Sequence, residues 1–330
     1  MAYSRLMVSH MRALARKIMP YLLFPLLMGG GIWLTFGLIG YGIAPMPAYA
    51  MVSLVFFLAV FGLEKVLPHR PEWTAADGQE LNDFGHGVFG TALGAGAGEA
   101  LGSLVFGSLG LWLAGQFGHG LWPAHLPFVV QVLLVYLLAD LGRYLQHRLM
   151  HHHPWLWRFH ALHHSVNKLG VLKNSRSHLV ERLMQPLCMF GLILALGAPP
   201  EVIFWYLMPN SFLGMLDHSN LDVRIGPLAW VINGPAEHRL HHSRDALEGN
   251  RNFGSALLIW DMLFGTYANP RPHYSPQAVG IENDPMPAGF LQQLLDPMFS
   301  SRPNLASSLT PSQTTSLATT RTTSRVTEQA

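Results

Sequence analysis

Four long apolar stretches constrain the fold of this chain more than any other feature. They cover roughly residues 20–43, 48–67, 88–116 and 123–146, and each is long enough to cross a bilayer as a helix. Because backbone that faces lipid must satisfy its own hydrogen bonds, such runs form helices rather than open sheets. The sequence therefore predicts an all-α, multi-pass membrane bundle of about four spans. The third stretch is rich in glycine and could instead form a broken helix or a tight hairpin.

A fifth apolar region, from about 185 to 216, is interrupted by Pro199-Pro200 and by Pro209-Asn210. Each part is too short to cross the bilayer unaided, so we expect a re-entrant or tight hairpin. If the hairpin enters and leaves by one face, the residues that follow it return to the side on which the fourth stretch ends.

Basic residues predict the orientation of the bundle. Four of them precede the first stretch: Arg5, Arg12, Arg16 and Lys17. The connections at 44–50 and 117–124 contain no Lys or Arg. Because Lys and Arg favour cytoplasmic loops, we expect both ends of the four-span block in the cytoplasm. The membrane would be a bacterial inner membrane or one of the endoplasmic-reticulum type.

Composition excludes several other classes of protein. The net charge of +2 gives no large basic field, so nucleic acid is not an expected partner. The single cysteine, Cys188, can form no internal disulfide and no CxxC metal site.

Glycines recur every fourth residue in the third stretch, at Gly90, Gly94, Gly98 and Gly102. This flat ridge predicts close helix packing, either within the chain or in a homo-oligomer.

Histidine is the anomaly of the composition, with 18 residues that gather in clusters. Three boxes have helical spacing, HxxxH once and HxxHH twice. Their members are His147, His151, His160, His163, His164, His238, His241 and His242. Residues three and four apart share one face of a helix, so the rings of each box can reach one region. We expect them in a histidine-rich helical cap on the cytoplasmic side.

Eight imidazoles exceed the four ligands of a structural zinc site, which implies two metal ions. Imidazole suits iron, copper, zinc and nickel alike, so ligand type does not identify the metal. No HExxH motif is present, so a zinc protease would lack its general base. A redox-active metal pair beside lipid points to activation of O2. A membrane metal transporter or metal-binding protein and a bis-histidine haem protein are the alternatives.

Two polar residues extend the face of the first box along the fourth stretch. Tyr144 lies about one turn and Asp140 about two turns before His147. Carboxylates often accept a hydrogen bond from the outer N–H of a metal-bound histidine, and we expect that supporting role for Asp140. Pairing with Arg143 is the alternative. We expect the same supporting role for Tyr144, because it lies on the same face of the helix.

The spacing of these motifs strongly resembles the fatty acid hydroxylase/sterol desaturase superfamily. The resemblance begins with Asp140-x3-Tyr144-x2-His147-Arg-x2-His151 and Phe159-His160-x2-His163-His164-Ser165. It continues through Asn174-Ser175-Arg176-x-His178, His218-Ser219-Asn220 and His238-Arg-Leu-His241-His242-Ser243. It closes with Asn252-Phe253-Gly254 and Ile259-Trp260-Asp261-x2-Phe264-Gly265-Thr266, and so covers roughly residues 130–267 in order.

The resemblance implies a membrane enzyme that uses two irons, O2 and external electrons to hydroxylate a lipid at an unactivated C–H bond. Desaturation of the lipid at the same site is the alternative. The resemblance assigns the eight box histidines as metal ligands, with His218 as a ninth and His178 as a tentative tenth. Relatives often have a further histidine where this chain has Gly214. Asp261 would help to lock the cap and could orient a ligand ring.

No fused electron carrier is recognisable, so the electrons are expected from a separate ferredoxin, or from cytochrome b5 with its reductase. A fatty acyl chain, a sterol and an aminolipid all remain open as substrates. The expected domains are membrane spans in 1–122, the histidine-box domain in 123–270, a cap segment in 271–300 and a disordered Ser/Thr-rich tail in 301–330.

Overall fold

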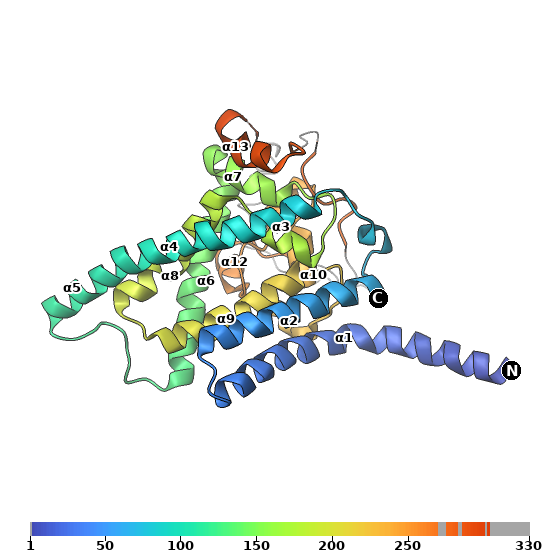
Figure 1. Cartoon of the computed structure of the whole chain (residues 1–330), viewed down its shortest axis with the longest axis horizontal. Coiled ribbons are helices and arrows are strands. Elements are labelled where there is room, and N and C mark those ends of the chain that lie inside the picture. Colours follow the sequence, from blue (N-terminus) through green and yellow to red (C-terminus); the bar gives the residue numbers. More distant parts are fainter. Residues whose placement is uncertain (1, 270–274, 283–285, 301, 304–330) are drawn as a thin grey trace.

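The protein is described by a computed structural model that covers residues 2–269, 275–282, 286–300 and 302–303. Within these ranges every regular element is a helix, which confirms the all-α prediction. Apart from Arg302 and Pro303, the predicted tail at 301–330 lies outside the described residues. Figure 1 shows long helices that run side by side, with shorter helices and loops gathered at one of their ends.

Five helical segments are long and apolar enough to cross a membrane: Lys17–Gly40, Pro45–Val66, Glu80–Phe117, Phe128–His152 and Leu179–Leu196. The first four correspond to the predicted spans. Large apolar side chains along them face outward, such as Trp33 and Leu104, which are 72% and 68% exposed. Exposed apolar surface of this extent suits a lipid environment. The chain is a multi-pass membrane protein.

Helices α1 (Ala2–Gly40), α2 (Pro45–Val66) and α9 (Pro200–Asp217) form one half of the bundle and lie together in Figure 1. Apolar side chains that recur on the facing sides of α2 and α9 make its core. Phe56 and Phe212 stack there, with ring centroids 4.7 Å apart. Gly31 of α1 lies against the same pair, because a side chain at that position would meet both rings.

The third span is one continuous helix from Glu80 to Phe117, so neither the break nor the hairpin considered for it occurs. It consists of α3 (Glu80–Phe89), α4 (Gly96–Gly102) and α5 (Ser108–Phe117), which are joined by π-helical turns at Gly90–Ala95 and Ser103–Gly107. The wider π turns keep the backbone hydrogen-bonded while they shift the register of the helix.

Helix α8 (Leu179–Leu196) lies between this long helix and α6 (Phe128–His152). The predicted glycine ridge forms the contact. A Cβ atom at Gly94 would lie 2.7 Å from the carbonyl oxygen of Leu179, and one at Gly98 would overlap that of Leu183. The ridge therefore packs against α8 of the same chain. A subunit contact through it would require α8 to leave, which argues against the predicted homo-oligomer surface.

Helices α8 and α9 form the predicted hairpin, and the expected interruption at Pro199-Pro200 separates them; the expected break at Pro209-Asn210 and the expectation that each part is too short to span were wrong. The turn is at Gly197, whose φ of +81° suits glycine, and at the prolines that follow it. Pro209 does not interrupt α9 but lies inside it. Each helix has 18 residues, and α8 is long and apolar enough to be a fifth candidate span.

The remaining elements form the cap at the ends of α6, α8 and α9. They comprise η1 (Pro71–Thr74), α7 (Pro154–His164), η4 (Val171–Ser175), η5 (Gly226–Trp230), α10 (Pro235–His241), α11 (Ala246–Gly249), α12 (Ile259–Phe264) and α13 (Phe290–Phe299). The cap lies on the side of the basic end of α1, since the backbone N–H of Arg224 donates to the carbonyl oxygen of Pro20.

Candidate metal centre

The histidine boxes lie where membrane helices end and the cap begins. Helix α6 ends at His152, and Pro154 at once begins α7, because its fixed φ suits a first helical position. The sharp turn between them places the α7 box over the α6 box. Helix α10 likewise begins with Pro235 and carries the third box.

The structure brings nine of the ten predicted ligands into two buried clusters. The five-histidine cluster contains His147, His151, His160, His164 and His241. The four-histidine cluster contains His163, His218, His238 and His242. Within each cluster the ligand nitrogens all lie within 4.8 Å of one another.

Each HxxHH box contributes to both clusters. In α7 the first and last histidines, His160 and His164, face the five-histidine cluster, and His163 faces the other. In α10 the pattern is reversed, so that only His241 faces the five-histidine cluster. Positions i and i+4 share a face of the helix, whereas position i+3 is rotated from them. The spacing of the box thus allows one helix to serve two adjacent sites.

Backbone carbonyl groups fix which ring nitrogen carries the proton. The Nδ1 atoms of His147 and His241 donate to the carbonyl oxygens of Phe253 at 2.9 Å and Arg251 at 2.7 Å. In the other cluster, the Nδ1 atoms of His163 and His218 donate to those of Arg176 at 3.1 Å and Gly214 at 3.0 Å. A carbonyl only accepts, so each of these Nδ1 atoms carries hydrogen and each Nε2 presents a lone pair.

These lone pairs face one another. The Nε2 atoms of His163 and His218 lie 3.2 Å apart, yet neither carries a proton to donate. The Nε2 atoms of His147 and His241 are buried, and within the described residues they have no hydrogen-bond partner. Two opposed buried lone pairs repel unless a cation lies between them. Their separation is also close to the ~3 Å expected between neighbouring nitrogens bound to one metal at about 2.1 Å. The residues fit a metal in each cluster.

Burial keeps these rings neutral at neutral pH. It lowers the pKa of His218 to about 4 and that of His241 to about 3, with the backbone hydrogen bonds opposing the shift. For His163 and His242, burial and then the neighbouring histidines lower the pKa well below the usual value. Neutral imidazole is the metal-binding form, so the clusters need not lose protons to bind metal near pH 7.

Two side chains that we did not predict contact ligand rings of the five-histidine cluster. The carboxylate of Glu181, which is 2% exposed, lies 3.1 Å from Nδ1 of His160, without the alignment of a hydrogen bond. Its Oε1 also lies 3.6 Å from the Arg143 guanidinium. Asn250 lies 3.3 Å from Nδ1 of His151. The sequence did contain a signal for Glu181, because an acidic residue in the first turn of a mainly apolar helix often has a functional partner.

Within the described residues, neither Asp140 nor Tyr144 has a hydrogen bond to a ligand ring, so the supporting hydrogen bond expected of them does not occur. Asp140 accepts the backbone N–H groups of residues 255–257, the shortest from Ala256 at 2.6 Å. Tyr144 contacts the hydroxyl of Thr266 at 3.0 Å. Asp261 accepts the N–H groups of Phe253 and Gly254, both at 2.8 Å. The two carboxylates anchor the loop whose Phe253 carbonyl accepts from His147.

His178 lies outside both clusters. Its Nδ1 accepts the N–H of Val180 at the start of α8, and its Nε2 lies 3.0 Å from the carbonyl oxygen of Leu294. Both ring nitrogens are thus used in capping and in holding α13. Gly214 supplies only the carbonyl that accepts from His218. The four-histidine cluster therefore has one imidazole fewer than its neighbour.

Comparison with known proteins agrees with this geometry. Residues 132–266 match the family model described as fatty acid hydroxylase. The chain is 37% identical over 249 residues to the ornithine lipid hydroxylase of Rhizobium tropici, an alignment that covers 74% of this chain and 73% of that protein. The chain belongs to the fatty acid hydroxylase family. The matched region includes every member of the two clusters.

Other relatives of this hydroxylase family differ in the substrate that their names state. The alkylglycerol monooxygenase of Danio rerio is 29% identical over 231 residues, which cover 68% of this chain and 48% of that protein. The cholesterol 25-hydroxylase of Mus musculus is 32% identical over 156 residues, which cover 44% of this chain and 51% of that protein. No solved structure matches the chain. Like these relatives, the chain is an oxidoreductase of the lipid hydroxylase type.

Proposed function

We propose that this chain inserts one oxygen atom of O2 into an unactivated C–H bond of a membrane lipid. The observation that carries the proposal is the pair of buried histidine clusters with opposed lone pairs, at the ends of membrane helices. Membership of the hydroxylase family supports oxygen insertion over desaturation. The relatives act on chemically different lipids, so the family supports a membrane lipid as the substrate class.

Two irons would be held by the clusters, one by His147, His151, His160, His164 and His241, and the other by His163, His218, His238 and His242. When bound, the irons would supply the redox chemistry that activates O2 for cleavage of a C–H bond, while two electrons from an external donor and two protons reduce the second oxygen atom to water. The chain contributes geometry, since carbonyl groups hold four of the rings in place. The histidines are buried, which excludes bulk water from the site.

The site would face the cytoplasm. The contact between Arg224 and Pro20 links the cap to the basic end of α1, and basic segments remain on the cytoplasmic side. A soluble ferredoxin, or cytochrome b5 with its reductase, could then deliver electrons to the exposed face of the cap. Sustained turnover by purified protein with reduced metal but no carrier would contradict the need for such a partner.

The test compares the lipids of cells that contain or lack the chain by mass spectrometry. We expect a lipid that gains one oxygen in the presence of wild-type protein, and none with His163→Ala or His241→Ala. His125→Ala is the matched control, because this exposed histidine lies in the loop before α6, at the end of that helix opposite the two clusters. A lipid that loses two hydrogens would indicate desaturation. A product that persists in both cluster variants would refute the proposal.

A further inference from the structure

A cavity of about 220 Å³ lies at the membrane-facing edge of the cap. It is open on one side and is lined by the end of α2, by η1, by the start of α3 and by the segment that leads into η4. The lining residues used below are Phe61, Glu64, Lys65, Glu80, Asp83, Lys168 and Lys173. Pockets for drug-sized molecules occupy about 300–1,000 Å³, so this cavity suits a small polar group rather than a whole lipid.

The cavity lies at the depth of lipid headgroups. Lys65 is in the last turn of the α2 span, and Glu80 is the first residue of the α3–α5 span. The ends of spans coincide with the interfacial layer of a bilayer. Phe61, one turn inside the membrane from Lys65, is 41% exposed and also lines the cavity. A headgroup in the cavity could therefore keep its acyl chains in the bilayer.

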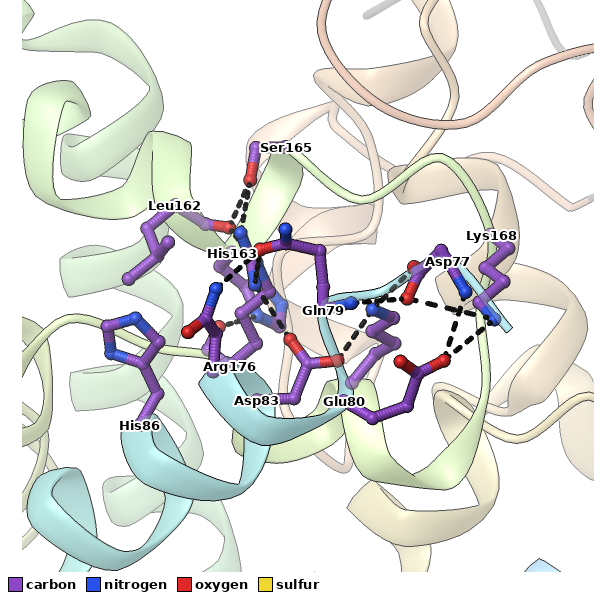
Figure 2. A network of polar contacts seen from close by, with 12 residues as sticks. Asp77, Gln79, Glu80, Asp83, His86, Leu162, His163, Ser165, Lys168 and Arg176 are labelled. Atoms are coloured by element: carbon purple, nitrogen blue, oxygen red, sulfur yellow. Dashed lines mark hydrogen bonds and ion pairs between the residues drawn. The ribbon is translucent and has the colours of Figure 1, made fainter. Parts of the chain in front are cut away.

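The cavity carries both signs of charge in equal number. Its lining includes three acids, Glu64, Glu80 and Asp83, and three lysines, Lys65, Lys168 and Lys173. Buried pairs form its floor, with Lys173 Nζ 2.6 Å from Asp83 and 2.7 Å from Asp77. Figure 2 shows Asp77 and Asp83 on this floor and the approach of Lys168 to Asp77 and Glu80. Such a balanced lining suits a ligand that itself carries both charges.

Two charges at the edge of the cavity are available to a ligand. Within the described residues, Lys65 forms no ion pair; its Nζ lies 5.2 Å from the centre of the Phe61 ring and 3.5 Å from the carbonyl oxygen of Thr74. An ammonium has three donors, which leaves some of them for an anion. The side chain of Glu80 is 44% exposed; its Oε1 accepts the backbone N–H of Asp77 at 3.0 Å and lies 3.7 Å from Lys168, which leaves its other oxygen for a ligand.

The floor of the cavity touches the groups that orient the four-histidine cluster. Asp83 accepts from the Arg176 guanidinium at 2.7 Å, and the carbonyl of Arg176 accepts from His163. Figure 2 shows this path from Asp83 through Arg176 to His163. On the other side, Glu64 accepts the backbone N–H of Asn220, two residues after His218, at 2.6 Å. A group in the cavity would lie next to this cluster.

We propose that this cavity binds a zwitterionic lipid headgroup, with Lys65 on its anionic group and Glu80 on its amine. The proposal rests on the proposed function and refines it, because the headgroup would belong to the lipid that is hydroxylated. The balanced lining disfavours neutral lipids, which leave Lys65 without an anion and add no cation to the long ion pair of Glu80. It disfavours purely anionic lipids too, since these bring a second negative charge near Glu80 without a cation to offset it.

Three synthetic lipids test each charge by itself. N-acyl ornithine carries a carboxylate and an amine, N-acyl norvaline lacks the amine, and N-acyl-1,4-diaminobutane lacks the carboxylate. Affinity for the purified, delipidated full-length protein would be measured by native mass spectrometry. We expect N-acyl ornithine to bind about tenfold more tightly than either analogue, as the loss of one charge-assisted contact predicts.

The variants should remove this discrimination selectively. Lys65→Gln should bind N-acyl ornithine and N-acyl-1,4-diaminobutane equally, and Glu80→Gln should bind N-acyl ornithine and N-acyl norvaline equally. Lys17→Gln and Glu201→Gln are exposed controls of the same chemistry elsewhere on the chain, and they should retain wild-type preferences. Equal binding of all three lipids to the wild type, or unchanged preferences in both cavity variants, would overturn the proposal.

The two proposals can fail separately. If the wild type binds the zwitterionic lipid selectively but no lipid gains oxygen in cells, the cavity stands and the hydroxylase function fails. If a lipid gains oxygen in cells while both cavity variants keep wild-type lipid preferences, the function stands and the cavity assignment fails.

Discussion

At the scale of single residues, the clustered histidines divide their two ring nitrogens between different tasks. In His147, His163, His218 and His241, one nitrogen donates to a backbone carbonyl and the other faces the cluster. The outer hydrogen bond selects the tautomer and fixes the plane of the ring. A metal would thus meet nitrogens that are already oriented, which reduces the entropic cost of binding it.

Removal of one ring from a cluster should affect mainly the metal of that cluster. We expect His163→Ala to bind about one metal per chain and to lose the metal of the four-histidine cluster. His241→Ala should lose that of the five-histidine cluster. Metal per chain after reconstitution would be measured by plasma mass spectrometry, with His125→Ala as the control. Loss of both metals in both variants, with the protein still folded, would show one joint site rather than two.

Glu181 should tune the five-histidine cluster through His160. Glu181→Gln keeps the volume of the side chain but removes the negative charge beside Nδ1 of that ring. Loss of such an outer partner typically costs 10–100-fold in metal affinity. Competition with a metal chelator would measure this affinity, and the effect should fall on the five-histidine cluster alone. Glu201→Gln is the matched control, and an unchanged affinity in Glu181→Gln would contradict the role.

The ligand set could be predicted from the sequence because helical spacing is local. The division of each HxxHH box between two clusters could not, since it depends on how α7 and α10 face each other. Glu181 was missed for the same reason, because its contact with His160 joins two separate helices. Asp140 was placed on the correct face of α6, but the partner that it meets is a loop more than a hundred residues away.

At the scale of elements, two carboxylates from different helices hold the loop at 252–257. Asp140 of α6 accepts three backbone N–H groups, and Asp261 of α12 accepts two. A loop held from both sides positions the Phe253 carbonyl against His147. The anchoring of this loop is therefore part of the metal centre, although neither acid reaches a ligand ring.

Asp140→Asn should loosen this loop. An amide is neutral, and its NH2 group would face backbone N–H donors in place of one carboxylate oxygen. Hydrogen bonds to charged groups contribute about 1.5–3 kcal/mol, and we expect the free energy of unfolding to fall by about that amount. Hydrogen exchange should increase at residues 253–257. Asp222→Asn, which removes a partly exposed pair with Arg224, should cost less than about 1 kcal/mol. Equal effects of the two substitutions would contradict the anchoring role.

Contact between the third span and α8 depends on the absence of side chains on the glycine ridge. Gly98→Ala would force a Cβ against the carbonyl oxygen of Leu183, and overpacking of this kind costs about 1–3 kcal/mol. Gly107 lies in the same helix with nothing within 4 Å of a Cβ atom. Gly107→Ala should therefore be neutral or stabilise by up to about 1 kcal/mol. Thermal unfolding in detergent would measure both, and a harmless Gly98→Ala would show that the helices are not closely packed.

The sequence predicted the helices better than it predicted their interruptions. Apolar length identified the spans, because the bilayer fixes how long they must be. Pro209 was a poor guide, since a proline in a membrane helix is tolerated where neighbouring groups satisfy the freed backbone. Pro199-Pro200 was a good guide, since it separates α8 from α9, whereas the positive φ of Gly197 in the same turn appears only in the structure.

At the scale of the whole molecule, a lipid-facing bundle carries a polar cap that is built around histidine. Helices α6, α8 and α9 end on one side, and their ends provide or support ligands of both clusters. The cap also contacts the basic end of α1. The domain boundaries near 122, 270 and 300 remain predictions. The histidine region cannot be independent of the membrane bundle, however, because α8 packs between α6 and the third span.

The central claim is that two metals are held by nine histidines. The direct measurement is the number of iron ions bound per chain after anaerobic loading of the purified protein with ferrous iron, combined with Mössbauer spectroscopy. We predict two irons per chain in two unequal, nitrogen-rich environments, one for each cluster. A folded wild-type protein that binds no iron, or that saturates at one iron per chain, would contradict the account.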